Sequence, residues 1–232
     1  MKTRLALLLA GLLLAAGFAG LGQWQLDRAL AKQRMLLNVD AALARKQALP
    51  LSAAEKPLGY DWSQGSGRFL DGPALLLDNQ RRGPAVGVRV LAAFQPTEGA
   101  PLLVDLGWLA LPGDRQLPEI SIPAGPRSLT GLLSPPPSTG LALGPAYTES
   151  APGRWLLTRI DLPVLSAGLR VSLAPRVLRL DPALPIGYAR DLDVLPNTLP
   201  PERHRGYAVQ WFGLALATLL ISLYFGIFRR RP

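Results

Sequence analysis

Cysteine is absent from the 232-residue sequence, and histidine occurs once, as His204. The lack of cysteine excludes disulfides, lipoprotein anchoring, thiolate metal sites and thiol catalysis, but it leaves the cellular compartment open. One histidine cannot build a zinc site unaided. Lysine occurs only before residue 57, which excludes a Ser–Lys dyad from the β-rich region predicted below. The four lysines are Lys2, Lys32, Lys46 and Lys56.

Other catalytic motifs are missing as well. No glycine-rich phosphate loop is followed by a lysine. His204 precedes an apolar segment and lies far along the chain from most serines, which disfavours a Ser-His-Asp triad. Asp191 and Asp193 form a lone Asp-x-Asp pattern in a proline-rich loop, for which a solvated turn and a weak calcium site both stay open. The sequence therefore favours a binding or assembly role over hydrolysis.

Two long apolar segments stand near the ends of the chain, at residues 5–21 and 207–228. The first has 17 residues without a charge, the lower limit for crossing a bilayer, and the second has 22. The chain between them is too rich in proline and polar residues to cross. This layout predicts a membrane hairpin whose middle region lies on one side of the bilayer.

Basic residues are concentrated next to the two apolar segments. Residues 1–56 carry eight Lys and Arg against three Asp and Glu, and residues 201–232 carry five against one. Residues 57–200 carry twelve of each sign and are neutral. Anionic lipid headgroups attract such basic ends, whereas a neutral middle region gives no footprint for nucleic acid.

Short basic tails indicate the orientation of the hairpin. Lys2 and Arg4 precede the first apolar segment, and residues 229–231, all arginine, follow the second. The positive-inside rule therefore predicts that both termini are cytoplasmic and that the central domain is periplasmic. Three basic residues just beyond the first segment oppose this assignment: Arg28, Lys32 and Arg34.

A cleavable signal peptide is the alternative for the first apolar segment. Residues 1–4 would form its charged region and residues 5–16 its apolar core, with Gly17-Phe18-Ala19 as a small-residue cleavage site. The second segment would anchor the chain in either case.

The chain between the apolar segments changes character near residue 60. Residues 23–46 lack glycine and proline and place leucines near helical spacing, so the first helix is predicted to continue to about residue 46, turning along the membrane surface. Residues 50–60 are interpreted as a linker. One short helix is predicted at 161–168, with Asp161 as N-cap, Pro163 in its first turn and Gly168 at its end.

Short apolar or alternating runs between Gly and Pro turns predict a β-rich domain over residues 60–196. The predicted fold class is therefore an α+β membrane protein in which two transmembrane helices, 5–21 and 207–228, flank a compact antiparallel barrel or sandwich outside the cytoplasm. Seven runs are predicted as strands: 67–70, 74–78, 86–94, 101–110, 127–133, 154–160 and 175–180.

The most distinctive cluster of side chains begins at His204. On a helix, Ala208, Trp211 and Ala215 fall on the His204 side, and small alanines would leave a flat shelf there, facing lipid or another helix. A neutral imidazole can serve as an axial ligand of haem iron. Arg203 and Arg205 beside it could pair with haem propionates, and Trp211 could flank the ring. The alternative is that His, Tyr207 and Trp211 only mark the membrane interface, with arginines snorkelling beside them.

Three motifs occur at the outer end of the first segment, in the middle of the chain and before the second segment. They are Leu21-Gly22-x-Trp24-Gln25-Leu26-x-Arg28, Leu103-Val104-Asp105-Leu106-Gly107-Trp108 and His204-x-x-Tyr207-Ala208-x-Gln210-Trp211-Phe212. In this order they resemble the motifs of the Surfeit locus protein 1 family of cytochrome oxidase assembly factors. Leu106 replaces an arginine of the family's central motif, and Arg205 replaces a leucine of its C-terminal signature.

The resemblance implies an accessory protein, rather than an enzyme, of the bacterial or mitochondrial inner membrane, and we expect the bacterial inner (plasma) membrane here. Such proteins help mature the catalytic subunit of a haem-copper oxidase and are proposed to receive haem a, with the signature histidine, here His204, as ligand of the iron. Implied partners are the catalytic subunit, haem a synthase and membrane lipids. The residues assigned to the haem site are His204, Tyr207, Trp211, Arg203, Arg205, Trp24, Gln25 and Arg28.

Two other functions stay open on the sequence. A cofactor-free scaffold would hold oxidase assembly intermediates through its β-rich domain. A membrane-tethered hydrolase has little support, because the chain lacks the usual lysine and histidine residues. For Trp24 and Gln25 in particular, packing of the two segments near the outer interface and simple interfacial anchoring are both possible.

Overall fold

A computed structural model describes the chain except for residues 1, 113–116, 118, 138–142, 196–197 and 229–232. The basic tail at 229–231 and the predicted domain end at residue 196 therefore lie outside the described residues. The chain forms two compact units, Met1–Leu37 with Thr198–Pro232, and Asn38–Asn197. We describe each unit by itself.

The first unit consists of helices. α1 (Lys2–Arg45) is rich in alanine and leucine and contains no proline, and its last residues belong to the second unit. α3 (Pro201–Leu223) starts with a proline in its first turn, where no backbone donor is lost, and the π-helical segment η2 (Tyr224–Phe228) continues it. Both helices are long and apolar enough to cross a membrane. α1 is one continuous helix. The structure therefore shows no break within residues 23–45, where the sequence analysis predicts a turn along the membrane surface.

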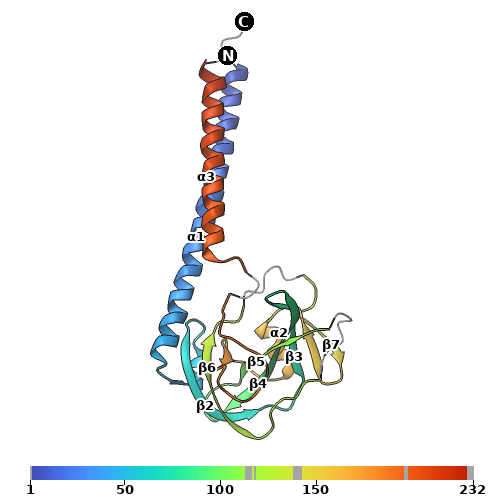
Figure 1. Ribbon diagram of the computed structural model, residues 1–232. Helices are drawn as coiled ribbons and strands as arrows, with labels where there is room; N and C mark the ends of the chain where they lie inside the picture. The colour runs from blue at the N-terminus through green and yellow to red at the C-terminus, as the bar shows by residue number, and fades with distance from the viewer. Residues whose placement is uncertain (1, 113–116, 118, 138–142, 196–197, 229–232) are drawn as a thin grey trace. The chain divides into compact units, whose positions relative to one another are not determined.

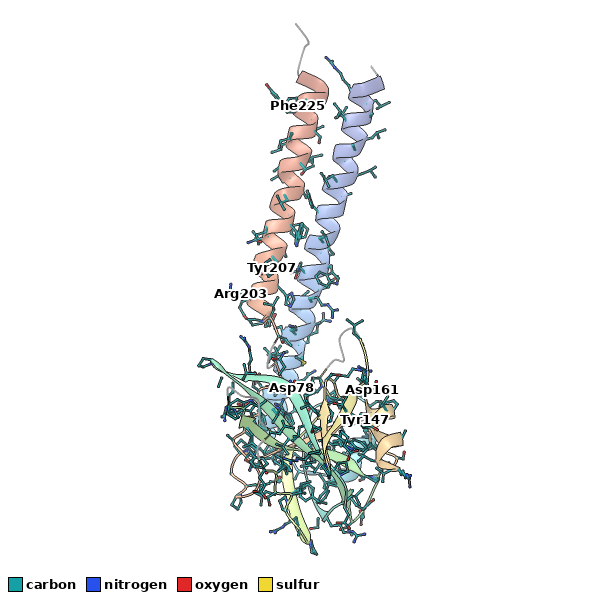
Figure 2. All side chains as sticks on the ribbon, turned by 90° about the vertical axis from the view of Figure 1, so that its right-hand side faces the viewer. Asp78, Tyr147, Asp161, Arg203, Tyr207 and Phe225 are labelled. Atoms are coloured by element: carbon teal, nitrogen blue, oxygen red, sulfur yellow. The ribbon has the colours of Figure 1, made fainter. Side chains whose placement is uncertain are left out.

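α1 and α3 lie side by side and antiparallel, as Figures 1 and 2 show. Small residues of α1 make this close approach possible. A Cβ atom on Gly11 would lie 1.8 Å from the Ser222 hydroxyl, and one on Gly22 would lie 2.8 Å from the Phe212 ring. Gly17 and Gly20 have no such neighbour within 4 Å. Gly11 and Gly22 therefore lie on the packing face of α1.

The second unit contains one nine-stranded sheet with the order β1-β2-β6-β9-β5-β4-β3-β8-β7. Most pairs are antiparallel, but β1–β2, β3–β8 and β5–β9 are parallel, so the prediction of an antiparallel sheet was only partly right. The strands are β1 (Leu49–Pro50), β2 (Asp61–Phe69), β3 (Ala74–Arg82), β4 (Ala85–Pro96), β5 (Leu102–Ala110), β6 (Pro126–Ser134), β7 (Tyr147–Ala151), β8 (Arg154–Leu157) and β9 (Val177–Leu180).

Five of these strands form a closed circuit of pairings. β2 pairs with β6, β6 with β9, β9 with β5 and β5 with β4, and residues 94–96 of β4 pair back with residues 67–69 of β2. The first half of β4 instead pairs with β3, which leads outward to β8 and β7. Figure 1 shows the labelled strands β2, β4, β5 and β6 wrapped around a common centre.

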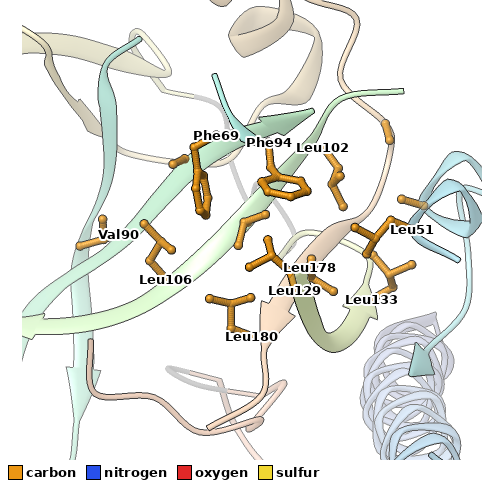
Figure 3. Packing of buried hydrophobic residues seen from close by; sticks show 14 of the residues in the cluster. Leu51, Phe69, Val90, Phe94, Leu102, Leu106, Leu129, Leu133, Leu178 and Leu180 are labelled. Carbon is orange, nitrogen blue, oxygen red and sulfur yellow. The ribbon is translucent and has the colours of Figure 1, made fainter. Parts of the chain in front are cut away.

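Alternating residues of the strands fill the centre of this circuit. The Phe69 and Phe94 rings meet edge to face with centroids 5.1 Å apart, among leucines from β5, β6 and β9 (Figure 3). The opposite face of β4 and β5 contributes Leu91 and Leu103 to a second cluster, which α2 (Leu162–Leu169) covers through Leu165. The period-two pattern used to predict the strands is thus the pattern that divides these two cores.

The local predictions differ from the structure in a few places. The segment read as a linker holds β1 and the 3₁₀ helix η1 (Leu51–Glu55), the strand predicted at 154–160 ends at Leu157, and β7 was not predicted. The N-cap of α2 is Asp161, as predicted, and its carboxylate accepts from the Val164 N–H at 3.3 Å. Gly168 does not end this helix: a Cβ there would lie 2.8 Å from the Trp155 ring, so glycine makes room for an aromatic side chain.

Candidate functional site

His204 lies in the first turn of α3 and is 8% exposed. Its Nδ1 lies 2.7 Å from the Oε1 atom of Gln25 on α1, although the two residues are 179 positions apart. A carbonyl oxygen only accepts hydrogen bonds, so Nδ1 carries the proton and Nε2 presents its lone pair. Gln25 thus fixes both the plane and the tautomer of the imidazole.

The Nε2 atom of His204 is buried and has no hydrogen-bond partner among the residues that the structure describes. Leaving a buried acceptor unsatisfied costs about 1–3 kcal/mol, so such an atom needs an explanation. A neutral imidazole with a protonated Nδ1 and a free Nε2 is the form that ligates metal ions. The residues present therefore fit an iron ligand at this position.

The His204 face of α3 is turned toward α1 rather than toward lipid. Ala208 is buried, Trp211 and Ala215 are half-buried, and the Trp211 ring centroid lies 5.7 Å from that of Phe18 on α1. Of the two orientations left open by the sequence, the structure has the interhelical one. A ligand that reaches Nε2 must therefore enter between α1 and α3, which requires a local opening of the helix pair.

Several basic side chains lie near the first turn of α3. Arg203 and Arg205 are exposed, and the Arg205 guanidinium donates a hydrogen bond to the Gln33 side-chain oxygen. The Lys32 ammonium donates to the backbone oxygen of Leu199, just before α3 begins. These two hydrogen bonds connect α1 to the start of α3. Their partners on the α3 side, Leu199 and Arg205, lie close to His204 in the sequence. Figure 2 marks Arg203 on α3.

The remaining predicted site residues occupy the exposed surface of the helix pair. Trp24 is 49% exposed, with the Arg28 guanidinium 5.6 Å above its ring, as expected for residues one helical turn apart. Tyr207 is 41% exposed on α3 (Figure 2). The structure thus brings Gln25 to His204 and Arg28 to Trp24, and it pairs Trp211 with Phe18 rather than with Trp24.

Sequence reasoning missed Phe18, Lys32 and Gln33 as neighbours of the site. A heptad spacing could have indicated Phe18 and Lys32, because one row of the less exposed residues of α1 recurs at alternating steps of three and four, as does one row of α3; Gln33 lies beside this row. In α1 these positions are 8, 11, 15, 18, 22, 25, 29, 32, 36 and 39, and in α3 they are 201, 204, 208, 211, 215, 218 and 222.

The central motif lies on β5 in the second unit. Asp105 is buried and pairs with Arg89 at 2.6 Å and with Arg179 at 3.7 Å. Leu106, which replaces the arginine expected from the resemblance, is fully buried in the core of the strand circuit. Gly107 has a φ of 116°, and a Cβ there would lie 2.7 Å from the Tyr188 carbonyl oxygen. Its role is to permit this backbone conformation and close approach.

The Asp191 and Asp193 carboxylates stabilise their own loop. Asp191 accepts from the Asp193 N–H at 3.2 Å, and Asp193 accepts from the Leu195 N–H at 2.8 Å. Within the part of the chain that the structure describes, no group of three or more His, Asp or Glu side chains could hold a metal ion. The geometry is that of a polar turn, the first of the two readings that the sequence allowed.

Comparison with protein families gives a match over most of the chain. The model of the SURF1 family (the Surfeit locus protein 1 family of the resemblance above) matches residues 12–216, from within α1 to within α3. No curated protein matches the chain.

Proposed function

The chain belongs to the SURF1 family, and we propose that it helps assemble a haem-copper oxidase by holding haem a at His204 and passing it to the catalytic subunit. The family is associated with cytochrome oxidase assembly, and its members are assembly factors rather than enzymes. Together with the two apolar helices, this membership indicates a membrane protein. The holding of haem a is the part of the function that we infer from the site.

The single observation that carries this proposal is the buried, unpartnered Nε2 of His204. Gln25 holds the ring in the tautomer that leaves Nε2 available. When bound, haem a would supply an iron that this nitrogen could ligate. The exposed Arg203 and Arg205 are close to His204 in sequence and carry the charge that haem propionates require.

The apolar tail of haem a determines where it can be handed over. Moving apolar chain from a bilayer into water costs ~0.8 kcal/mol per methylene, so release into the aqueous phase is unfavourable. The donor and the acceptor must then reach the helix pair through the membrane, which suits haem a synthase and the oxidase catalytic subunit. Trp24, Arg28 and Tyr207, exposed on the helices, would contact lipid headgroups at the interface.

The proposal places the protein in a bacterial inner membrane with both termini in the cytoplasm and the β-rich unit in the periplasm. The basic residues in the short tails outside the two apolar segments, Lys2, Arg4 and the arginines at 229–231, support this topology. It also puts His204 near the periplasmic surface, because His204 lies at the end of α3 next to the β-rich unit in the sequence.

The visible absorption spectrum of the purified chain tests this function. Full-length chain co-expressed with haem a synthesis and purified in mild detergent is expected to carry the absorption of haem a in stoichiometric amounts. A colourless preparation that still co-purifies with oxidase subunits would contradict haem holding. That outcome would instead support the cofactor-free scaffold.

Gln25 provides a separate test of the tautomer argument. Replacing Gln25 with alanine is expected to lower haem a retention by about 10–100-fold, the usual cost of removing the partner that orients a metal-ligating histidine. Replacing it with glutamate keeps an acceptor for Nδ1–H and should leave retention near that of the unchanged chain. Retention is measured by titrating the purified apo chain with haem a and following the visible band.

Gln23 is the matched control for this substitution. It lies two positions away on α1, is exposed, and donates a hydrogen bond to the Asp27 carboxylate at 2.9 Å, whereas Gln25 accepts one from His204. Gln23→Ala should therefore leave haem a retention unchanged. Equal losses from Gln23→Ala and Gln25→Ala would show that helix destabilisation, rather than the histidine tautomer, accounts for the effect.

A further inference from the structure

Three buried charges lie together in the β-rich unit, and their signs do not balance. The side chains of Arg89, Asp105 and Arg179 are 11%, 6% and 10% exposed. Both arginines approach the same oxygen of Asp105, Arg89 at 2.6 Å and Arg179 at 3.7 Å. The triad therefore has a surplus of one positive charge in a poorly solvated place, where an uncompensated charge is costly.

The second oxygen of Asp105 is also occupied, since it accepts from the Gly107 N–H at 3.0 Å. Arg179 is left with a buried Nε that has no hydrogen-bond partner. Burial lowers the pKa of the Arg179 guanidinium, and Asp105 opposes this shift. Asp105 therefore cannot satisfy both arginines.

A cavity of about 420 Å³ opens beside this triad. Arg89 lines it, and the two carboxylates at its wall, Asp191 and Asp193, are near enough to act on Arg179. Trp108 lines it as well. The Trp108 indole N–H donates to the Gln80 carbonyl at 2.9 Å, and the ring occupies space that a Cβ on Gly87 would invade at 2.7 Å. The aromatic wall of the cavity is thus held in place by the sheet.

The other cations of the cavity add to the surplus. Arg190 donates to four backbone carbonyls, among them Asp181 at 3.0 Å and Tyr188 at 3.2 Å, and the described residues offer it no carboxylate at ion-pair distance. Arg82 pairs with Asp191 at 3.5 Å, with side chains 41% and 44% exposed. An exposed pair of this kind is worth at most about 1 kcal/mol, so another carboxylate can replace Asp191.

We propose that this cavity binds one carboxylate side chain of a partner protein. Among the described residues, four arginines (Arg81, Arg82, Arg89 and Arg190) and two carboxylates line the cavity, so a carboxylate can offset its positive surplus, whereas Asp191 and Asp193 at the wall disfavour ligands of higher negative charge. Arginine recognises carboxylates with paired N–H groups, and arginine and tryptophan are both among the residue types enriched at the energetic centres of protein interfaces. The site lies wholly within the β-rich unit and does not depend on haem a or His204.

An NMR spectrum of the chain in nanodiscs, labelled with ¹⁵N-tryptophan, tests this proposal. The indole N–H signal of Trp108 reports on the cavity. The probe is a capped Ala-Glu-Ala peptide, and its control is the capped Ala-Gln-Ala peptide. The glutamate peptide is expected to move the Trp108 signal saturably, while the glutamine peptide leaves it in place. The signals of Trp62 and Trp155, from the same unit but outside the cavity, confirm that the chain stays folded.

Arg82 is the residue to change, because it lies on the exposed rim of the cavity. Arg82→Gln is expected to weaken binding of the glutamate peptide about five-fold, while Arg127→Gln, an exposed arginine on β6 outside the cavity, leaves it unchanged. Equal responses to both peptides, no response to either, or a response to inorganic phosphate but not to the glutamate peptide would each overturn the proposal.

Discussion

Replacing His204 with alanine is expected to abolish the haem a absorption of the purified chain, a loss of retention greater than about 100-fold. His204 is the chain's only histidine, and cysteine is absent, so no other side chain of these two strong ligand types can substitute for it. The substitution removes the buried Nε2 from the helix interface but also the hydrogen bond to Gln25, so folding of the helix pair is checked alongside. Visible spectra of the two proteins, purified in parallel, measure the effect.

Glu202→Ala serves as the control for His204→Ala. Glu202 lies in the same helical turn and is exposed, and its removal should leave the spectrum unchanged. Circular dichroism of both variants checks that the helices and the sheet are retained. A His204→Ala protein with the full haem a band would mean that His204 is not the ligand.

Replacing Asp105 with alanine is expected to give the largest loss of stability in the β-rich unit. The change leaves the Arg89 and Arg179 guanidinium groups buried without their shared counter-charge, and removing one partner of a buried ion pair costs about 3–5 kcal/mol. It also removes the acceptor for the Gly107 N–H. For a unit of this size, the expected fall in melting temperature is about 10 °C.

Thermal unfolding followed by near-ultraviolet circular dichroism of the chain in detergent measures this difference. Asp191→Ala is the matched control, because it also takes a carboxylate from an arginine but at an exposed pair. Its effect should stay below about 1 kcal/mol. Similar melting temperatures for Asp105→Ala and Asp191→Ala would show that the buried triad contributes no more than a surface ion pair.

The apolar segments and the main strands could be predicted because each has a strong local period. The predicted run 86–94 falls within β4, and the run 101–110 nearly coincides with β5. Both strands bury alternating residues on the two faces of the sheet. β1 and β7 carry weaker signals, because β1 has two residues and β7 is mostly exposed at the edge of the sheet.

The contact between Gln25 and His204 could not be predicted in the same way. The residue types and helical offsets indicated that His204, Ala208 and Trp211 share a face, but a helical period does not say what covers that face. Only the packing of α1 on α3 determines it. The parallel pair β5–β9 was missed for a similar reason, because β9 comes from a segment about 70 residues further along the chain.

β9 completes the strand circuit late in the synthesis of the protein. β9 fills the place between β5 and β6, although both of these strands are synthesised well before it. Until residues 177–180 arrive, each of the two older strands exposes a row of unpaired backbone groups, and such open edges invite pairing with other chains. The apolar helix α3 begins only about twenty residues later, so the sheet closes and this helix emerges at nearly the same stage of biosynthesis.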